Sequence, residues 1–262
     1  MSATHGDFIW YELMTSDADA AQAFYAGLTG WTYADSGQTH IDYRVVAAGD
    51  EPVGGILALS DQMLAGGARP AWVGYVQSDD LDGSLAALEA AGGSVMMSPV
   101  ELPGVGRFAM IMDPQGASLY LIDDESGRPS NAFSAYEPRV GHCAWNELIT
   151  ADPAAARRFY GGLFGWVVAD SMDMGPMGPY EMLKNGVDRD FMFGGMMKKP
   201  DMMPVSSWSY YFRVADIDAA AGHIAAGGGQ VLNGPQEIPG GEFIINGADP
   251  QGAMFSIIGK RS

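Results

Sequence analysis

The sequence predicts an α+β protein in which a strand–helix–strand–strand–strand (βαβββ) module occurs four times. Residues 9–36 align without gaps to residues 144–171, and 16 of the 28 positions are identical. A second block begins at Trp72 and Trp208, repeats at an offset of 136, and ends in the run Asp-Pro-Gln-Gly-Ala. Both blocks combine short strand-like runs with helix start and stop signals. Together these observations indicate a tandem duplication of a two-module unit.

Each half begins with a strand and a helix. The strands are predicted near 9–14 and 144–149, and Asp17 and Asp152 are the N-cap candidates of the helices that follow. We expect these helices to end near Gly27 and Gly162. The other predicted strands are 43–47, 54–59, 72–76, 94–97, 108–112 and 117–122, with 180–183, 191–197, 208–214, 230–233, 242–246 and 253–258 in the second half. Further helices are predicted over 81–91 and 217–226.

The length of 262 residues fits this duplication, since two units of about 125 residues and a linker account for it. We therefore predict domains at 1–125 and 139–262, joined by a linker at 126–138. The linker is rich in turn residues and has no apolar periodicity.

Composition excludes several classes of partner. The chain has 14 basic and 32 acidic residues, a net charge of −18, and 47% apolar residues. The apolar fraction is that of a folded protein. The strong negative charge disfavours binding to nucleic acid or to an anionic membrane, because both are negatively charged. Its one cysteine, Cys143, excludes an intrachain disulfide. No signal peptide or membrane span is visible. We expect a cytoplasmic protein, a monomer or homodimer, that binds a small molecule.

The repeated motifs resemble a known family. Phe24-Tyr25 and Gly30-Trp31, with Asp-Pro-Gln-Gly at 113–116, recur in the second half as Phe159-Tyr160, Gly165-Trp166 and the same run at 249–252. This pattern is similar to that of the vicinal oxygen chelate superfamily, which includes glyoxalase I, bleomycin-resistance proteins and extradiol dioxygenases. The resemblance implies a tandem pair of glyoxalase-like domains, each a curved mixed sheet around a cavity.

The resemblance does not extend to the metal ligands. Metal-using members carry a His or Glu on the first strand of a module and a carboxylate on the last. The matching positions here are Trp10 and Trp145 on the first strands, and Tyr120 and Ser256 on the last. None of these is a usual ligand of a divalent metal. We therefore expect no metal site and no cofactor.

Glu12 and Glu147 are the strongest polar signal. Side chains alternate along a strand, so each glutamate shares a face with the tryptophan two residues before it. If the tryptophans line the cavity, as the resemblance implies, the glutamates do too. Burial raises the pKa of a carboxyl and suits it to act as a general base. We expect Tyr120 or Tyr180 to donate a hydrogen bond to a substrate oxygen. The alternative is that both carboxylates are structural and were preserved by the duplication.

Aromatic and methionine residues supply the predicted ligand contacts. Six tryptophans form three repeat-related pairs, and nine methionines lie between 172 and 203. Methionine gives a flexible apolar lining, although core filling is an alternative and Cu(I) binding a remote one. The predicted ligand-binding residues are Trp10, Trp145, Trp72, Trp208, Met182, Met196 and Ser256. The four histidines lack chelating spacing, and we expect surface or loop roles for them.

The predicted function is that of a small-molecule protein of this superfamily, with lyase- or isomerase-like acid–base chemistry and without the usual metal ligands. The longer loops of the second half favour that half as the active one. The alternative is a non-catalytic protein that sequesters a toxin or antibiotic. A purely structural role has little support in the sequence.

Overall fold

A computed structural model describes residues 3–262. The elements of the first half are β1 (Phe8–Thr15), α1 (Ala18–Thr29), β2 (Thr32–Asp35), β3 (Tyr43–Ala48), β4 (Glu51–Ala58), α2 (Asp61–Ala65), β5 (Ala71–Gln77), α3 (Leu81–Ala90), β6 (Ser94–Leu102), β7 (Gly106–Met112) and β8 (Ser118–Asp124).

The second half repeats the order of strands, without a counterpart of α2 between β12 and β13 and with a short 3₁₀ turn, η1, between β10 and β11. Its elements are β9 (Cys143–Thr150), α4 (Pro153–Phe164), β10 (Trp166–Asp173), η1 (Gly175–Met177), β11 (Pro179–Asn185), β12 (Gly194–Lys198), β13 (Ser207–Arg213), α5 (Ile217–Ala226), β14 (Gln230–Ile238), β15 (Glu242–Ala248) and β16 (Met254–Gly259).

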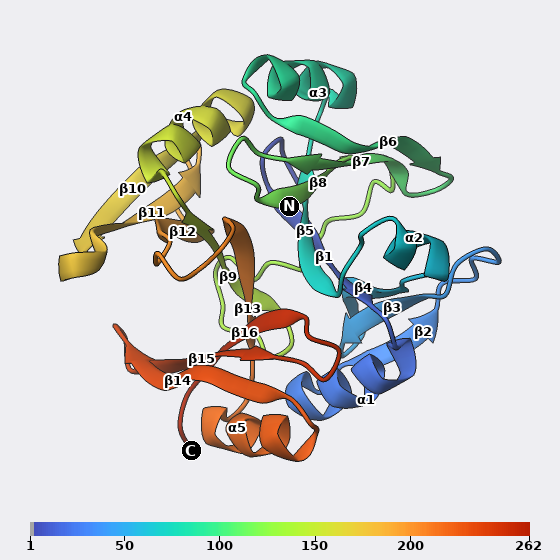
Figure 1. Cartoon of the computed structure of the whole chain (residues 1–262), viewed down its shortest axis with the longest axis vertical. Helices are drawn as coiled ribbons and strands as arrows, with labels where there is room; N and C mark the ends of the chain where they lie inside the picture. The colour runs from blue at the N-terminus through green and yellow to red at the C-terminus, as the bar shows by residue number, and fades with distance from the viewer. Residues whose placement is uncertain (1–2) are drawn as a thin grey trace. The chain divides into compact units, whose positions relative to one another are not determined.

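Each half forms one eight-stranded mixed sheet, and the two sheets have the same order (Figure 1). The first reads β2-β3-β4-β1-β5-β8-β7-β6 and the second β10-β11-β12-β9-β13-β16-β15-β14. In both, the first strand of each module pairs in parallel with the last, as β1 does with β4 and β5 with β8. The predicted α+β fold of repeated modules is therefore confirmed.

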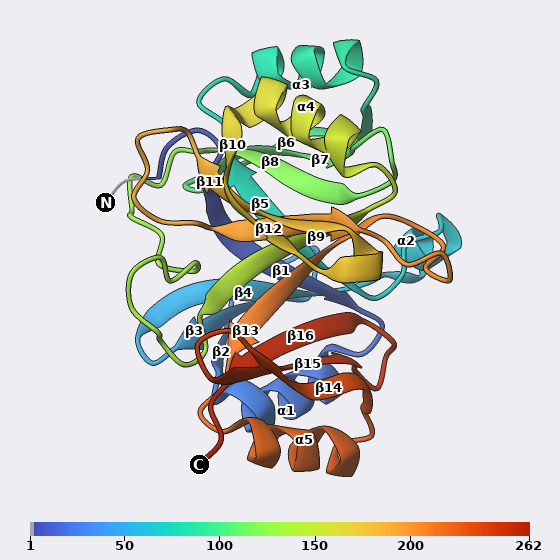
Figure 2. The ribbon, with the colours of Figure 1, turned by 90° about the vertical axis from the view of Figure 1, so that its left-hand side faces the viewer.

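The compact units of the chain do not follow its two halves. Unit 1 consists of Met1–Ile9, Gly74–Ser130 and Trp145–Trp208, and unit 2 of Trp10–Val73, Asn131–Ala144 and Ser209–Ser262. Each unit thus combines one module from each half. In unit 1, α3 lies beside α4, and in unit 2, α1 lies beside α5 (Figure 2). The predicted domain boundaries at 1–125 and 139–262 follow the sequence repeat, whereas these units cut across it.

The first helix of each half starts as predicted and ends later. Asp17 and Asp152 cap α1 and α4 by accepting hydrogen bonds from backbone amides in the first turn. The left-handed residues that end these helices are Gly30 and Gly165, so the predicted ends at Gly27 and Gly162 were too early. Gly27 lies inside α1, where a Cβ would overlap the imidazole of His223 in α5. This glycine therefore permits close packing of two helices and does not stop one.

The core of each unit lies between its sheets and helices. In unit 2, Tyr11 of β1 contacts Tyr210 of β13, with ring centroids 5.2 Å apart, and Phe24 of α1 contacts Phe255 of β16 at 5.7 Å. In unit 1, Trp166 of β10 contacts Trp208 of β13 at 5.7 Å. Because side chains alternate on a strand, these contacts fix which face of each strand is covered and which carries the remaining residues.

One reciprocal hydrogen-bond pattern accounts for the family motifs. The Tyr25 hydroxyl donates to Asp249 Oδ2 at 3.1 Å in unit 2, and the Tyr160 hydroxyl donates to Asp113 Oδ2 at 2.9 Å in unit 1. Each tyrosine comes from the Phe-Tyr motif of one half, and each aspartate from the Asp-Pro-Gln-Gly run of the other. The other carboxylate oxygen of Asp249 accepts bonds from the amides of its own turn. These motifs therefore have a structural role within each unit.

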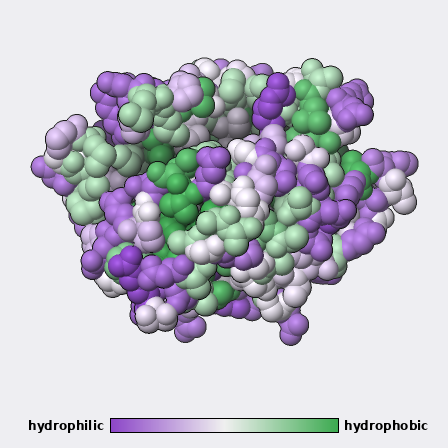
Figure 3. Space-filling view, turned by 60° about the horizontal axis from the view of Figure 1, so that its bottom comes forward, coloured by the Kyte–Doolittle hydropathy of each residue, from purple (hydrophilic) through white to green (hydrophobic). Residues whose placement is uncertain are grey.

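Figure 3 shows one face with separate hydrophobic patches on a largely hydrophilic background. Across residues 3–262, no helix has the length and apolar character needed to span a membrane.

Candidate functional site

Four acidic side chains are buried among residues 3–262: Glu12, Asp113, Glu147 and Asp249. The two aspartates belong to the structural turns described above. Burial raises the pKa of Asp249, and it raises the pKa of its partner Tyr25 well above the usual value, so the Tyr25 phenol keeps its proton and donates it to the carboxylate in a hydrogen bond. The two glutamates, by contrast, lie on the first strands of the two halves, β1 and β9.

Glu147 lies on the strand face opposite the core of unit 1. On β9, Asn146 and Leu148 point to the helix-covered face and are fully buried. Trp145 and Glu147 therefore point to the other face, as the alternation predicts. Glu147 is 8% exposed, so it is nearly but not fully enclosed.

Tyr180 of β11 joins these two residues. The Trp145 indole Nε1 donates to the Tyr180 hydroxyl at 2.6 Å, and that hydroxyl donates to Glu147 Oε1 at 2.9 Å. The indole occupies the acceptor side of the phenol, so the phenolic hydrogen is directed at the carboxylate. The structure thus brings together three residues predicted separately as ligand-binding or catalytic.

A glycine makes room for this arrangement. Gly195 of β12 is in register with Glu147, and a Cβ at that position would overlap the phenol of Tyr180. Any other residue at this position would displace the Tyr180 ring from the carboxylate.

The first half contains the same set in unit 2. The Trp10 indole Nε1 donates to the Tyr43 hydroxyl at 2.9 Å, Glu12 shares the strand face of Trp10, and a Cβ at Gly55 would overlap Tyr43. Glu12 is 3% exposed and so more enclosed than Glu147. Sequence reasoning missed Tyr43, although its place before Gly54-Gly55 matches that of Tyr180 before Gly194-Gly195. We call these two sets the Trp–Tyr–Glu triads.

Other predicted site residues lie elsewhere. Tyr120 stacks on Tyr75 in unit 1, with centroids 4.3 Å apart and planes 16° from parallel. Trp72 and Trp208 are core residues, and their indoles donate to the Tyr25 and Tyr160 hydroxyls at 3.0 and 3.1 Å. Their prediction as ligand-binding residues is corrected accordingly, because their strand faces are the helix-covered ones.

The two methionines predicted to bind ligand have different environments. Met182 shares the strand face of Tyr180 on β11 and is partly exposed. Met196 pairs with Leu148 and is 1% exposed, so it belongs to the core of unit 1. Core filling, the alternative reading of the methionines, holds at this position.

Ser256 of β16 belongs to a polar network in unit 2, where its hydroxyl shares a hydrogen bond of 2.7 Å with Ser209. The histidines have separate positions. His5 bonds the Leu163 carbonyl, His223 bonds the Phe24 carbonyl, and His142 is buried and donates from Nδ1 to the Asn131 carbonyl at 2.7 Å. Burial lowers the pKa of His142. His142 lies in the loop that precedes β9, as predicted, but it is buried and not at the surface.

The residues present do not fit a divalent metal. At the family's ligand positions, Trp10 and Trp145 offer indole N–H groups that are already donated to tyrosines, and Tyr120 is stacked on a ring. An indole N–H cannot coordinate a cation. Among residues 3–262, no three His, Cys, Asp or Glu side chains come close enough together to hold one.

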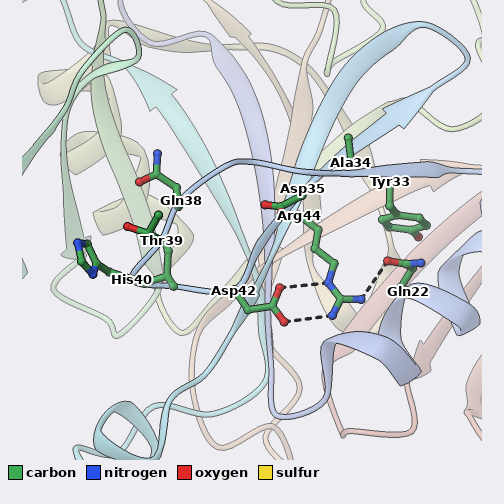
Figure 4. Close-up of a pocket in the computed structure, with 10 residues that line it drawn as sticks. Gln22, Tyr33, Ala34, Asp35, Gln38, Thr39, His40, Asp42 and Arg44 are labelled. Atoms are coloured by element: carbon green, nitrogen blue, oxygen red, sulfur yellow. Dashed lines mark hydrogen bonds and ion pairs between the residues drawn. The ribbon is translucent and has the colours of Figure 1, made fainter.

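An open pocket of about 620 Å³ lies apart from the triads (Figure 4). Arg44 of β3 lines it and donates to Asp42 at 3.1 and 3.2 Å and to Gln22 of α1 at 3.0 Å. Because Arg44 points toward α1 while its neighbour Tyr43 contacts Trp10, the pocket and the triad lie on opposite faces of β3. His40 is on the exposed rim. Asp42 and Asp19 pair with Arg44, so the pocket has no uncompensated cation.

Comparison with known proteins agrees with these motifs. The model of the Glyoxalase/Bleomycin resistance protein/Dioxygenase superfamily matches residues 8–121 and again residues 139–257. The chain belongs to this superfamily.

Relatives of this glyoxalase superfamily member span nearly its whole length. CFP32 of Mycobacterium bovis, which is named as a glyoxylase, is 35% identical over 253 residues, or 95% of this chain and 93% of that protein. The anthracycline biosynthesis protein DauV of Streptomyces sp. strain C5 is 29% identical over 276 residues, covering 96% and 92%.

Solved structures agree on the fold. The Mn(II)-bound glyoxalase from Novosphingobium aromaticivorans has a TM-score of 0.65 at 17% identity, covering 98% of this chain and 83% of the other. A homoprotocatechuate 2,3-dioxygenase variant from B. fuscum has a TM-score of 0.66 at 13% identity, covering 99% and 74%. At such identities the likeness supports the superfamily fold and not a shared reaction.

Proposed function

We propose that the chain binds a planar, hydroxylated aromatic small molecule at the Trp145–Tyr180–Glu147 triad and catalyses proton transfer on it. The observation that carries the proposal is the directed pair of hydrogen bonds from Trp145 to Tyr180 and from Tyr180 to Glu147. The name of the Streptomyces relative, an anthracycline biosynthesis protein, supports an aromatic ligand.

The aromatic residues and Met182 supply apolar contact for a flat ring. Aromatic and methionine side chains bind such rings through stacking and polarisable sulfur contacts. Tyr180 and Glu147 supply the polar end, where a ligand hydroxyl or carbonyl is recognised. A combination of mostly apolar contacts with a few placed polar groups is typical of small-molecule sites.

Glu147 is the proposed general base. Glu147 Oε1 accepts the hydrogen bond of Tyr180. A carboxylate can accept several hydrogen bonds at once, so Glu147 can also accept one from a ligand. It takes a proton from a carbon or oxygen next to a carbonyl of the ligand and returns it at a second atom, so no oxidant or other reactant is required. When the ligand is bound, the hydrogen of the Tyr180 hydroxyl turns from Glu147 to the ligand oxygen on which negative charge develops, which leaves Glu147 free to take the proton.

We further propose that this chemistry proceeds without a metal held by these residues. Dialysis against a chelator should leave ligand affinity unchanged. A stoichiometric metal whose removal abolishes binding would contradict this part of the proposal.

Binding is tested by calorimetric titration with alizarin, a planar dihydroxyanthraquinone. Glu147→Gln or Tyr180→Phe should weaken binding about 10- to 100-fold, because each removes a hydrogen bond that involves a charged group. The repeat-related variants Glu12→Gln and Tyr43→Phe are the matched controls and should bind as the wild type does. Equal affinities for all five proteins would contradict the proposed site.

Proton transfer is tested with α-hydroxyacetophenone in D₂O. Its hydrogens next to the carbonyl should exchange with solvent in the presence of the wild type and not of Glu147→Gln, as followed by NMR. A second candidate function is sequestration without turnover, which the mutual bonding of the triad favours. Tight alizarin binding without any exchange would support that candidate over catalysis.

A further inference from the structure

A row of uncharged polar side chains crosses the second module of unit 2. On β13 and β16, Tyr210, Phe212 and Phe255 point into the core. The alternate positions, Ser209, Tyr211 and Ser256, therefore point to the opposite face. Strand register extends this row, since Tyr211 pairs with Ser256, Ser256 with Asn246 of β15, and Asn246 with Asn233 of β14.

The members of this polar row are bonded to one another. Asn246 Nδ2 donates to Ser256 Oγ at 2.8 Å and to the Tyr211 hydroxyl at 3.3 Å, and Ser256 shares its bond of 2.7 Å with Ser209. At the outer end, Asn233 Nδ2 donates to Asn246 Oδ1 at 3.0 Å. Asn233 itself is exposed to solvent.

This polar row differs from the solvent-exposed face of an ordinary sheet. Ser256 is 1% and Tyr211 5% exposed, so these polar groups are enclosed. Burying polar groups costs free energy unless they are bonded, and an apolar row would be less costly to build. The mutual bonds hold the amides and hydroxyls in fixed orientations, which is what a recognition surface requires.

The repeat shows that the fold does not require this row. The equivalent positions of the first half are Val73, Tyr75, Tyr120, Met110 and Met97. There, Met110 pairs with Tyr120, and Tyr120 stacks on Tyr75. An apolar and aromatic row therefore builds the same sheet, whereas the second half carries amides and hydroxyls at the equivalent positions.

We propose that the row Asn233, Asn246, Ser256, Ser209 and Tyr211 binds the uncharged, polyhydroxylated part of a small molecule, such as a sugar. Amides and hydroxyls both donate and accept, as sugar hydroxyls do. No charged residue belongs to the row. Arg213, two residues beyond Tyr211 on the same face of β13, is paired with Glu242 of β15 by two hydrogen bonds, so its charge is compensated. This proposal does not depend on the proposed function, because none of its residues belongs to the Trp145–Tyr180–Glu147 triad.

The test is an NMR titration of the whole chain, labelled with ¹⁵N, with methyl glucoside. Shift changes should concentrate on the side-chain amides of Asn233 and Asn246 and on the backbone of β13 to β16. Asn246→Leu and Ser256→Ala should each weaken binding by about tenfold or more, since each removes ligand-facing hydrogen bonds. Met110→Leu, at the repeat-equivalent position, is the matched control and should bind as the wild type does.

Glucuronate and glucosamine distinguish a neutral site from a charged one, and both should bind more weakly than methyl glucoside. No shift change with methyl glucoside at high millimolar concentration would overturn the proposal, as would binding that survives in folded Asn246→Leu. Alizarin binding measured on the same variants keeps the two proposals separate, because a failure here leaves the Glu147 site unaffected.

Discussion

In each half, a single glycine allows the ring of a triad tyrosine to take its position. Gly195 and Gly55 leave the space that Tyr180 and Tyr43 occupy. Neither glycine is in the left-handed region, so the requirement is for space and not for backbone freedom. The sequence showed the glutamates and tryptophans of the triads through strand alternation. It did not show the tyrosine partners, because a hydrogen bond between β9 and β11 depends on register, which no local pattern reveals.

Gly195→Ala should weaken alizarin binding about tenfold, since the added methyl group displaces Tyr180 from Glu147 and removes one hydrogen bond. Calorimetric titration measures this. Gly162→Ala is the control, because a Cβ at this helical position meets nothing within 4 Å. Unchanged affinity in Gly195→Ala would show that the position of Tyr180 does not matter for binding.

His142 should make stability fall in mild acid. Burial lowers its pKa from 6.5, so below that pH the unfolded chain binds more protons than the folded one. The free energy of unfolding contributed by His142 is therefore fully present above pH 6.5 and lost as the pH falls toward its folded pKa. In denaturant titrations between about pH 5 and 7, His142→Gln should show a smaller pH dependence than the wild type. The control is His40→Gln, in an exposed loop, whose stability should depend on pH as that of the wild type does. The same pH dependence in His142→Gln would contradict the role given to the burial of His142.

At the scale of the elements, the Phe-Tyr helix and the Asp-Pro-Gln-Gly turn act together. Each tyrosine hydroxyl accepts from a tryptophan and donates to an aspartate. Both motifs are visible in the sequence, as are the strands and helix starts. That Tyr25 bonds Asp249 of the other half is not visible, because the two residues are brought together by the assembly of modules and not by spacing. For the same reason Trp72 and Trp208 were predicted to bind ligand.

Tyr160→Phe and Tyr25→Phe should each lower the free energy of unfolding by about 1–3 kcal/mol, because each leaves a buried carboxylate oxygen and an indole N–H without their bond. Tyr33→Phe is the control. The Tyr33 hydroxyl is buried with no hydrogen-bond partner among residues 3–262, so its removal should leave stability unchanged or raised. Chemical denaturation measures all three, and equal effects at the three positions would contradict this account.

At the scale of the whole molecule, the compact units of the structure do not coincide with the two repeats of the sequence. The repeat divides the chain at its middle, whereas unit 1 and unit 2 each take one module from each half. The sequence therefore predicted the number and type of modules correctly. It did not predict their partners, since repeat-related modules have similar apolar faces and sequence alone does not choose among them.

Residues 1–130 and 131–262, produced separately, should fail to fold as monomers. Each fragment lacks the helix that packs beside its own, as α1 does beside α5, and so exposes an apolar core. Produced together, the fragments should restore the circular dichroism and the cooperative unfolding of the intact chain. A fragment that unfolds cooperatively as a monomer, as judged by size-exclusion chromatography and denaturation, would contradict this.

The most direct test of the central claim is a crystal structure of the chain with bound alizarin. The account predicts the ring system beside Trp145 and Met182, with a ligand oxygen within hydrogen-bond distance of Glu147 or Tyr180. Alizarin bound instead in the open pocket around Arg44, with the triad unchanged, would contradict it.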